Sequence, residues 1–349
     1  MQQGTFKSAR WTEVAGRLEV SASERVAPKA QEVQIAVGSA GICGSDLHSF
    51  RGDFDPRVGR TPGHEISGTV SAVPGGVRHV KEGDVVGIEP LLRCGFCRFC
   101  MSGDYNICTE RGLIGAGVDG GMSEFVNVPA NTVYRVPSGV DTEVGALAEP
   151  LACSVHGFER VRLKGAETVL IVGAGTIGLT AILAARARGA RVIVLARHPH
   201  QRDAALKCGA NEVIDESEAG KARLEELMSL RAIDVSVETV GGHGDALIQA
   251  QRAVRPKGRV LVLGVFTVPT LTIDGRYLSG PEVEIVGSMV YSARDGRSDY
   301  QVALEIIADN VEAARSLITH RFSLDDVQTA FETALDKSTK SIKVHLNPS

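Results

Sequence analysis

The stretch VLIVGAGTIG, residues 169–178, decides the fold of this chain. A run of apolar, mostly β-branched residues indicates a buried strand, and the glycines after it have the spacing G-x-G-x-x-G. In this pattern the first glycine permits a tight turn, the second lets the backbone approach a pyrophosphate, and the third allows helix and strand to pack closely. The three are Gly173, Gly175 and Gly178. Because a helical pattern follows, we favour a dinucleotide site over a purely structural turn.

The sequence around this turn alternates strands with helices. Apolar strands are predicted at 167–173, 190–196, 258–264 and 282–288, and the stretches between them, including 199–209, have helical patterns. Alternation of this kind implies a parallel sheet with helices on both faces. We therefore predict a doubly wound α/β domain.

An uncharged run at 168–185 approaches the length that spans a membrane. The glycine turn interrupts it, so we favour a buried strand, a turn and an amphipathic helix over a membrane span. The helix is expected over 176–188, with one face formed by Ile177, Ala181, Ala184 and Ala185.

The first 150 residues have a different character. Short β-branched runs at 32–40, 65–73 and 83–90 are bounded by glycine or proline, and no long helical pattern occurs before residue 142. Helical stretches return near the C-terminus and are followed by a last strand. We expect three parts: a β-rich domain at 1–150, the α/β domain at 151–289, and a segment at 290–349 that packs back on the first domain.

Composition restricts the functions that the chain can have. Of 349 residues 43% are apolar and 23% charged, as in globular proteins, and the net charge of −4 does not favour nucleic acid or an anionic membrane as partner. The N-terminal residues are polar and lack the apolar core of a secretory signal. We therefore expect a reducing, cytoplasmic compartment, where clustered cysteines bind metal more often than they form disulfides.

Four cysteines gather in LLRCGFCRFCMSGDYNICTE, residues 91–110. Four thiolates at such short spacings can enclose a zinc ion in a closed tetrahedron, which leaves no position for substrate. This cluster is therefore predicted to hold a loop together and to take no part in catalysis. Disulfides are disfavoured by the compartment, and an iron–sulfur cluster remains an alternative. The four are Cys94, Cys97, Cys100 and Cys108.

A second set of residues has the types that a catalytic zinc needs, namely about three protein ligands and one exchangeable position. Cys43, His64 and a carboxylate would supply them, and the candidate carboxylates are Glu65 and Glu149. Glu149 directly precedes Pro150 at the start of a predicted helix, where Ser, Asp or Asn is the preferred cap. Its presence there suggests that the carboxylate serves another purpose.

Motifs along nearly the whole chain resemble the zinc-dependent medium-chain alcohol dehydrogenase family, most closely its polyol (sorbitol) and threonine dehydrogenase branch. They are, in family order, GICGSDLH (41–48), PGHEISGTV (62–70), the four-cysteine lobe (94–108), GALAEPLACSVHG (145–157), VLIVGAGTIGL (169–179) and KGRVLVLG (257–264). The resemblance implies a GroES-like catalytic domain and a Rossmann domain, with the active site in the cleft between them.

Carried over by position, the resemblance makes Cys43 and His64 ligands of a catalytic zinc. Glu149 stands where the members with a Cys2His site have their second cysteine. Glu65 is either a further ligand or a neighbour of the ligands. The four-cysteine cluster matches the structural zinc lobe, so the resemblance implies two zinc ions per chain.

The implied reaction is hydride transfer between an alcohol or polyol and a nicotinamide cofactor, with zinc polarising the substrate oxygen. Ser45 and His48 match the family's proton relay. Ser45 would take the hydroxyl proton and pass it, through cofactor ribose hydroxyls, toward His48 and solvent. Cys153 lies where the family packs a side chain against the nicotinamide.

Other functions remain as alternatives. An L-threonine-type amino-alcohol dehydrogenase belongs to the same branch, whereas a zinc-ribbon interaction module with a nucleotide-sensing domain belongs to a different class. A zinc-free quinone oxidoreductase of the same fold would lack both sets of ligands. We expect a small alcohol, polyol or carbonyl compound as substrate, and a homodimer or homotetramer.

The end of the second α/β strand, in RVIVLARHPHQR (191–202), bears on the choice of cofactor. An NAD site has Asp or Glu there, about 20 residues beyond the glycines, to bind the ribose 2′-hydroxyl. Here that position is Ala196, and Arg197 and Arg202 follow. Since guanidinium groups pair well with phosphate, the sequence favours NADP over NAD.

Overall fold

The computed structural model describes residues 4–55 and 57–348, which divide into two compact units, each with its own apolar core. The first unit contains the chain up to Glu149 and the chain from Ala293 onward, and the second runs from Pro150 to Ser292. The C-terminal segment therefore belongs to the same unit as the N-terminal part of the chain.

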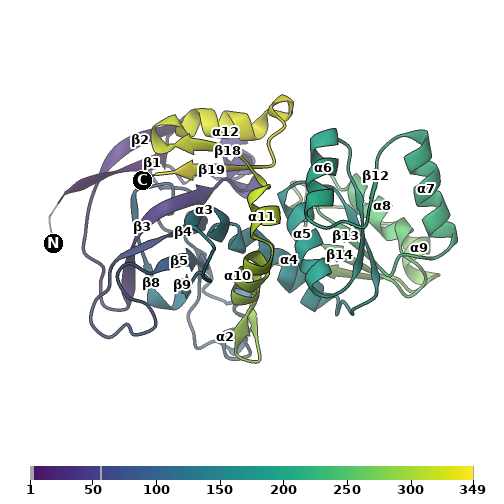
Figure 1. Ribbon diagram of the computed structural model, residues 1–349, viewed down its shortest axis with the longest axis horizontal. Helices are drawn as coiled ribbons and strands as arrows, with labels where there is room; N and C mark the ends of the chain where they lie inside the picture. The colour runs from purple at the N-terminus through teal and green to yellow at the C-terminus, as the bar shows by residue number, and fades with distance from the viewer. Residues whose placement is uncertain (1–3, 56, 349) are drawn as a thin grey trace. The chain divides into compact units, whose positions relative to one another are not determined.

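The first unit is built on a mixed sheet with the strand order β18-β19-β3-β4-β5-β9, in which β8 also pairs with β3 (Figure 1). Alternate residues of β3, namely Val33, Ile35 and Val37, are fully buried, so one face of this strand lines the core. The last strand, β19, lies antiparallel to β3, with His345 opposite Gly41. The strands are β3 (Glu32–Gly41), β4 (Glu65–Ala72), β5 (Val85–Ile88), β8 (Phe125–Pro129), β9 (Val133–Arg135), β18 (Ile318–Ser323) and β19 (Lys343–Asn347).

Short elements complete the described part of the first unit. Two-stranded sheets are formed by β1 (Thr5–Trp11) with β2 (Leu18–Glu24), β6 (Leu91–Leu92) with β7 (Gly112–Leu113), and β16 (Ala293–Arg294) with β17 (Arg297–Ser298). The helices are α1 (Gly44–Arg51), α2 (Arg98–Met101), α3 (Thr142–Gly145), α10 (Asp299–Asp309), α11 (Val311–Arg315) and α12 (Val327–Leu335), and the 3-10 turns are Tyr105–Ile107, Ala130–Thr132, Leu324–Asp326 and Lys337–Thr339. The sequence pattern did not reveal α1, because only Asp46 and Phe50 of this helix are buried.

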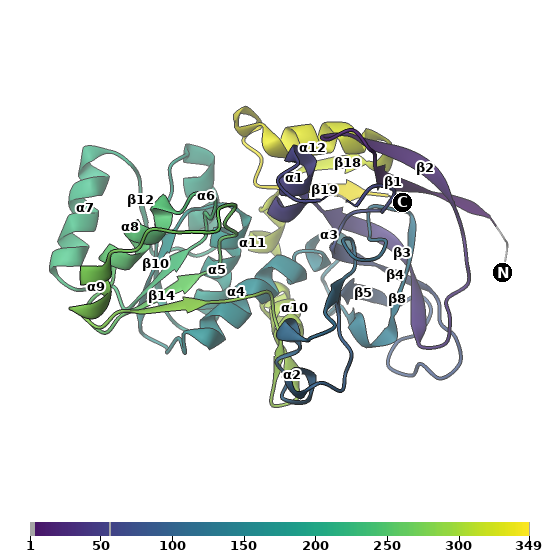
Figure 2. The same cartoon turned by 180° about the vertical axis from the view of Figure 1, so that it is seen from behind.

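The second unit contains a parallel sheet with the strand order β12-β11-β10-β13-β14-β15, the 3-2-1-4-5-6 order of a doubly wound fold. Helices α5 and α6 lie on one side of this sheet and α7 and α8 on the other (Figures 1 and 2). The predicted α/β fold is therefore confirmed. The strands are β10 (Thr168–Val172), β11 (Arg191–Leu195), β12 (Glu212–Ile214), β13 (Val235–Glu238), β14 (Arg259–Val262) and β15 (Glu284–Gly287). The helices are α4 (Ala148–Arg160), which begins two residues before the unit, α5 (Thr176–Ala187), α6 (Pro199–Lys207), α7 (Glu218–Ser229), α8 (Asp245–Ala253) and α9 (Gly275–Ser279).

The expectation of an amphipathic helix at α5 is wrong. Every residue from Gly178 to Ala185 is buried, so this stretch has no polar face. The helix packs against β10 and β11, and the Thr180 hydroxyl lies 2.9 Å from that of Ser154 on α4. Small side chains allow this enclosure. Among the described residues, no helix is both long and apolar enough to cross a membrane.

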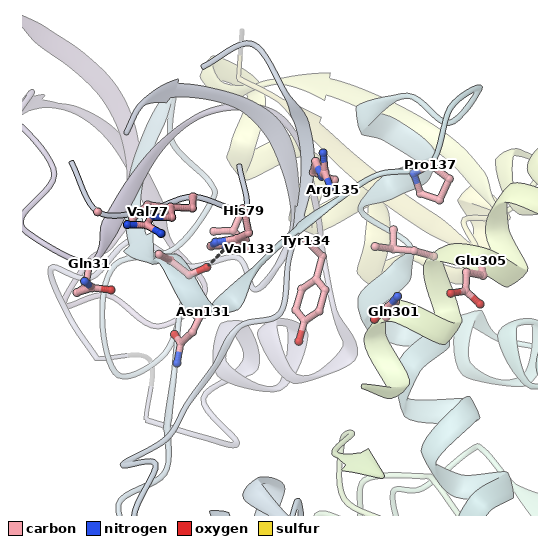
Figure 3. Close-up of a pocket in the computed structure, with 14 residues that line it drawn as sticks. Gln31, Val77, His79, Asn131, Val133, Tyr134, Arg135, Pro137, Gln301 and Glu305 are labelled. Carbon is pink, nitrogen blue, oxygen red and sulfur yellow. Dashed lines mark hydrogen bonds between the residues drawn. The ribbon is translucent and has the colours of Figure 1, made fainter. Parts of the chain in front are cut away.

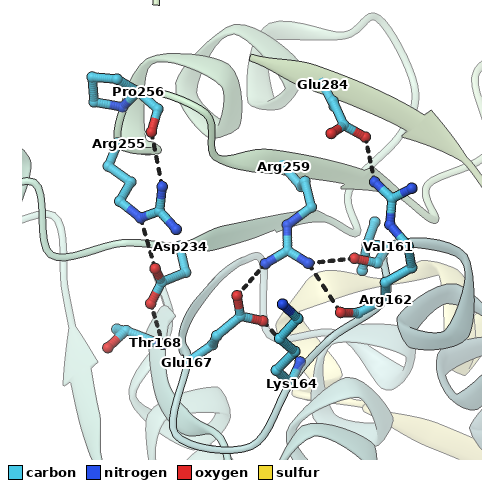
Figure 4. Close-up of polar contacts among 10 residues, drawn as sticks. All are labelled: Val161, Arg162, Lys164, Glu167, Thr168, Asp234, Arg255, Pro256, Arg259 and Glu284. Atoms are coloured by element: carbon cyan, nitrogen blue, oxygen red, sulfur yellow. Dashed lines mark hydrogen bonds and ion pairs between the residues drawn. The ribbon is translucent and has the colours of Figure 1, made fainter. Parts of the chain in front are cut away.

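Arginine contacts fasten the amino-terminal end of the parallel sheet (Figure 4). Arg259, the first residue of β14, donates to the carbonyl oxygens of Val161 (2.5 Å) and Arg162 (3.0 Å), just beyond α4, and pairs with Glu167. Because ligands of doubly wound sheets bind at the opposite, carboxyl end of the strands, these contacts stabilise the fold away from the expected cofactor site.

Candidate active site

The glycine turn joins β10 to α5. Gly173 has a φ of 103°, which residues with a side chain rarely adopt. A Cβ on Gly178 would strike the carbonyl oxygen of Gly173, whereas a Cβ on Gly175 would meet open space. The first and third glycines are thus needed for the turn itself, and the second leaves room for a ligand at the N-terminus of α5.

The residues at the end of β11 meet carboxylates from the end of β12. Ala196 is buried, as a small residue in the position of the usual acid. Arg197 Nε lies 2.8 Å from Glu216, and Arg202 Nη1 lies 2.5 Å from Asp215. Both arginines that the sequence assigns to a phosphate therefore already have acidic partners.

Cys43, His64 and Glu65 each offer a ligand atom, and these atoms lie within 4.8 Å of one another. Cys43 directly precedes α1, and Glu65 begins β4. Gly41 stands opposite Glu65 in the sheet, and a Cβ there would strike the Glu65 carboxylate. Glycine at position 41 thus gives the carboxylate its space.

The Glu65 carboxylate is paired with Lys343 of β19. Lys343 Nζ donates to the two carboxylate oxygens at 2.6 and 2.7 Å and to the carbonyl oxygen of Ile42 at 3.0 Å. Burial acts to lower the pKa of Lys343, but the neighbouring Glu65 and Cys43 outweigh it and raise that pKa. The sequence analysis missed Lys343, and no local pattern could reveal it, because 278 residues separate the partners.

His64 is buried beside a second carboxylate. Its Nδ1 lies 3.8 Å from Asp46 Oδ1, and Asp46 Oδ2 accepts a hydrogen bond of 2.9 Å from the backbone N–H of Cys43. Burial acts to lower the pKa of His64, yet Asp46, Cys43 and Glu149 outweigh it and raise that pKa well above its ordinary value. This concentration of negative charge is what a divalent cation would neutralise, and a carboxylate behind a histidine also orients the ring for a metal.

Glu149 lies in the first turn of α4 and is 4% exposed. Its negative charge contributes to the raised pKa of His64, but the ligand atoms that lie within 4.8 Å of one another are those of Cys43, His64 and Glu65. Cys153, one turn further along α4, is half-buried. His156 is buried, and its Nδ1 lies 3.2 Å from the hydroxyl of Ser292 in the same unit.

Helix α1 carries both residues of the predicted proton relay. Ser45 is half-buried, and His48 Nδ1 lies 2.8 Å from Asp53 Oδ2 and 3.0 Å from Arg51 Nη2. Gly52, with a φ of 83°, ends the helix and turns the chain so that Asp53 returns to His48. The hydrogen bond with His48 holds the pKa of Asp53 below its ordinary value. The sequence analysis missed Asp53, although a glycine and an acid just after the helix were an available signal.

The four cysteines of the lobe form a second group of ligand atoms within 4.8 Å of one another. The Sγ atoms of Cys94 and Cys108 are 3.6 Å apart, and those of Cys97 and Cys108 3.9 Å. A tetrahedral zinc with bonds of about 2.3 Å needs sulfur atoms about 3.8 Å apart, and disulfides are excluded at these distances. Backbone N–H groups of Cys100 and Thr109 lower the pKa of Cys97 to about 6, which favours a thiolate.

The buried carboxylate of Glu89, next to β5, forms hydrogen bonds with residues in and beside this lobe. Glu89 follows β5 and accepts hydrogen bonds from Arg93 Nη1 (2.8 Å) and the Tyr105 hydroxyl (3.0 Å). The Arg93 guanidinium also lies 3.9 Å from the centre of the Tyr105 ring. Since Tyr105 stands between the third and fourth cysteines, these contacts fix the lobe relative to β5.

A cavity of about 730 Å³ in the first unit is separate from all of these groups. Figure 3 shows Tyr134, Arg135, Gln301 and Glu305 around it. In the described part of the chain, its lining includes none of the predicted zinc ligands and neither residue of the relay. The site is therefore identified by its chemistry and not by the volume of a cavity.

Comparisons with known proteins agree with this chemistry. The chain matches the family models "Alcohol dehydrogenase GroES-like domain" over residues 29–138 and "Zinc-binding dehydrogenase" over residues 176–309. It is 33% identical to sorbitol dehydrogenase of Bacillus subtilis over 326 residues, which cover 91% of this chain and 90% of that relative. The chain belongs to the zinc-dependent medium-chain alcohol dehydrogenase family.

Further relatives support the same family. The L-idonate 5-dehydrogenase of Vitis vinifera is 34% identical, with 90% of this chain and 88% of that protein covered. An Escherichia coli oxidoreductase/dehydrogenase of unknown specificity, ECK1772, has a structure with a TM-score of 0.90 at 31% identity over 99% of this chain and 100% of that one. A zinc-binding dehydrogenase from Sinorhizobium meliloti bound to NADP (28%, TM-score 0.87, 99% and 100% covered) and an E. coli alcohol dehydrogenase complexed with NADH (27%, 0.87, 99% and 99%) are also similar.

Membership of this medium-chain dehydrogenase family makes the chain a zinc-dependent oxidoreductase acting on CH–OH groups, with a GroES-like and a Rossmann domain. The predictions of family, fold and reaction class are confirmed. The competing interpretation as an interaction module is not supported, because models of dehydrogenases match both parts of the chain.

Proposed function

We propose that the chain is a polyol or secondary-alcohol dehydrogenase whose catalytic zinc is bound by Cys43, His64 and Glu149. One thiolate, one imidazole and one carboxylate form a suitable donor set that leaves a position for substrate. The observation that carries the proposal is that ligand atoms of Cys43 and His64 lie within 4.8 Å of each other, and that the charges of Asp46 and Glu149 also act on His64. Glu65 is assigned to a supporting role, because Lys343 occupies both of its oxygens.

Part of the chemistry would come from bound zinc and cofactor, and part from residues of the chain. When bound, zinc would polarise the substrate oxygen, and a nicotinamide cofactor would exchange hydride with the substrate carbon. The Ser45 hydroxyl would accept the proton of the substrate hydroxyl while giving up its own, and the His48 imidazole would take up the released proton near solvent. In the tautomer of His48 that donates its Nδ1–H to Asp53, Nε2 is left as the nitrogen that can accept a proton.

Polyhydroxy compounds are the proposed substrate class. The named relatives include a sorbitol dehydrogenase and an L-idonate 5-dehydrogenase, which favours a polyol or sugar acid over an amino alcohol. A hydroxyl next to the reacting carbon would also give such substrates a second contact for orientation.

NADP is the proposed preferred cofactor. Ala196 replaces the carboxylate that would repel a 2′-phosphate, and Arg197 and Arg202 supply positive charge at the same strand end. Similar structures hold either NADP or NADH. Because both arginines are paired with acids, we expect the preference to be modest.

A second zinc is proposed for the four-cysteine lobe, where it would stabilise the fold, giving two zinc ions per chain. The lobe exposes 71% of Phe96 and 75% of Met101. Two such exposed apolar side chains on one lobe favour contact with a second copy of the chain. Met101→Glu should therefore lower the molar mass measured by light scattering.

The absence of disulfides among the described cysteines of this lobe suits the proposed reducing, cytoplasmic location.

The test is the absorbance at 340 nm with sorbitol, L-idonate, a secondary alcohol and threonine, each with NAD and NADP. We expect reduction of the cofactor with the polyhydroxy substrates. Cys43→Ala should abolish it and leave dinucleotide binding intact, because Cys43 and the glycine turn belong to different units. An active Cys43→Ala variant would overturn the proposed site.

A further inference from the structure

Two adjacent strands of the parallel sheet end at the proposed cofactor edge. Leu195 of β11 stands opposite Ile214 of β12, and the backbone N–H of Ala196 donates to the carbonyl oxygen of Ile214 at 3.0 Å. The two chains therefore leave the sheet side by side. Arg197 lies two residues beyond the end of β11 and Glu216 two residues beyond the end of β12, and their side chains form an ion pair.

The two acids at the end of β12 are held to different degrees. Asp215 Oδ1 accepts hydrogen bonds from the backbone N–H (3.1 Å) and hydroxyl (2.5 Å) of Ser217, the residue that caps α7, while Oδ2 pairs with Arg202. Glu216 and Arg197 are 64% and 69% exposed, and their pair has no further support. Asp215 is therefore a fixed charge, whereas Glu216 can be displaced.

We propose that Asp215 and Glu216 determine how strongly this chain discriminates between NADP and NAD, which rests on the proposed binding of a dinucleotide at this edge. Each carboxylate pairs with an arginine that would otherwise pair with the 2′-phosphate. The 2′-phosphate of NADP can pair with Arg197 only by displacing Glu216, and the negative charge of Asp215 repels it. The 2′-hydroxyl of NAD carries no charge and meets neither cost, so the acids allow both cofactors to bind.

The two carboxylates should differ in their effect. Neutralising Glu216 releases Arg197 without disturbing a cap, so it should increase discrimination for the phosphate directly. Neutralising Asp215 also weakens the acceptor that holds Ser217 at the start of α7, because an amide oxygen is a weaker acceptor than a carboxylate. Glu216→Gln is therefore the informative variant, since its effect on binding is not mixed with an effect on folding.

The experiment measures the affinity of the unmodified protein and of Glu216→Gln for 2′,5′-ADP and for 5′-ADP by calorimetry. We expect Glu216→Gln to bind 2′,5′-ADP roughly 3- to 10-fold more tightly, with the affinity for 5′-ADP changed by less than about 2-fold. The gain should shrink as salt is raised, because these groups are exposed. Glu212→Gln is the control, since Glu212 pairs with Arg191 and Arg223 at the other end of β12.

A second readout is the ratio of kcat/KM for NADP and NAD with one working alcohol, which should rise in Glu216→Gln and stay constant in Glu212→Gln. Arg197→Ala should lower the affinity for 2′,5′-ADP. Suppose the unmodified protein oxidises alcohols but Glu216→Gln changes neither the ratio of affinities for 2′,5′-ADP and 5′-ADP nor the ratio of kcat/KM for NADP and NAD. This inference then fails and the proposed function stands. If the unmodified protein binds neither nucleotide, the proposed cofactor and this inference fail together.

Discussion

The Lys343 ammonium lies 2.6 and 2.7 Å from the two carboxylate oxygens of Glu65, and the side chains are only 3% and 1% exposed. Removing one partner of such a buried ion pair lowers the stability of the fold, because the other charge is then buried without a counter-ion. Because both oxygens of Glu65 contact Lys343, we propose Glu149 and not Glu65 as the carboxylate that binds the metal.

Lys343→Met should destabilise the first unit by roughly 3–5 kcal/mol, because the Glu65 carboxylate would lose its counter-ion. Chemical denaturation measures the change. The double variant Lys343→Met/Glu65→Gln should recover part of the loss, and Lys337→Met, at an exposed lysine nearby, serves as control. Equal stability of Lys343→Met and the unmodified protein would contradict this account of the pair.

Glu149→Gln should lose zinc or slow turnover by roughly 10-fold or more, as expected when a metal ligand is weakened. Glu65→Gln should mainly lower stability, since it leaves Lys343 unpaired. Metal analysis and kcat/KM on both variants separate the roles. Zinc loss in Glu65→Gln together with an unaffected Glu149→Gln would exchange the two assignments.

Cys94→Ser should remove one of two zinc ions and lower the melting temperature, because a structural zinc contributes folding energy. Cofactor binding should persist, since the lobe and the glycine turn lie in different units. Cys208→Ala, at a buried thiol outside both metal groups, should retain both ions. Iron with inorganic sulfide in the purified protein would show that the lobe holds a different metal centre.

His48→Gln should slow alcohol oxidation most at low pH, where little hydroxide is present to accept the proton. Added basic buffer should restore part of the rate, because an external base can replace the relay. Asp53→Asn should show the same pattern more weakly, since it only loses the group that orients His48. His320→Gln is the control, and identical pH–rate profiles for all four proteins would remove His48 from the mechanism.

The stability of the first unit should fall in acid as Glu143 is protonated. Glu143 accepts hydrogen bonds from Arg321 (2.8 Å) and Asn347 (3.0 Å), and the Arg321 contact holds its pKa below the ordinary value. A depressed folded-state pKa gives stability that is fully present above the ordinary pKa of 4.5 and is lost as pH falls through the lower folded-state value. Unfolding midpoints measured as the pH is lowered through these values should change less with pH in Glu143→Gln. If the unfolding midpoint of Glu143→Gln depends on pH as steeply as that of the unmodified protein, the acid sensitivity comes from other groups.

Local patterns in the sequence predicted much of this molecule. The glycine turn and the four cysteines lie within short stretches, so their spacing alone indicates the geometry that the structure has. The set of Cys43, His64 and Glu149 required the resemblance to a family as well, because each of these residues taken singly suits a buried structural role.

Contacts between distant parts of the chain were not predictable in the same way. Lys343 reaches Glu65 only because β19 pairs with β3, and Glu216 meets Arg197 only because β12 lies next to β11. The environment of α5 was misjudged for a related reason, since the sequence does not show how many neighbours surround a helix of small residues.

The position of β19 beside β3 has a consequence for how the protein matures on the ribosome. Residues 32–65 are translated before the second unit, but β19, which pairs with β3, is translated after it. The second unit can fold as soon as residue 292 has left the exit tunnel, whereas Glu65 gains its partner only when Lys343 has left it as well. Nascent chains should therefore fold the second unit before Glu65 and Lys343 can pair, so the sheet of the first unit should be completed after the second unit has formed.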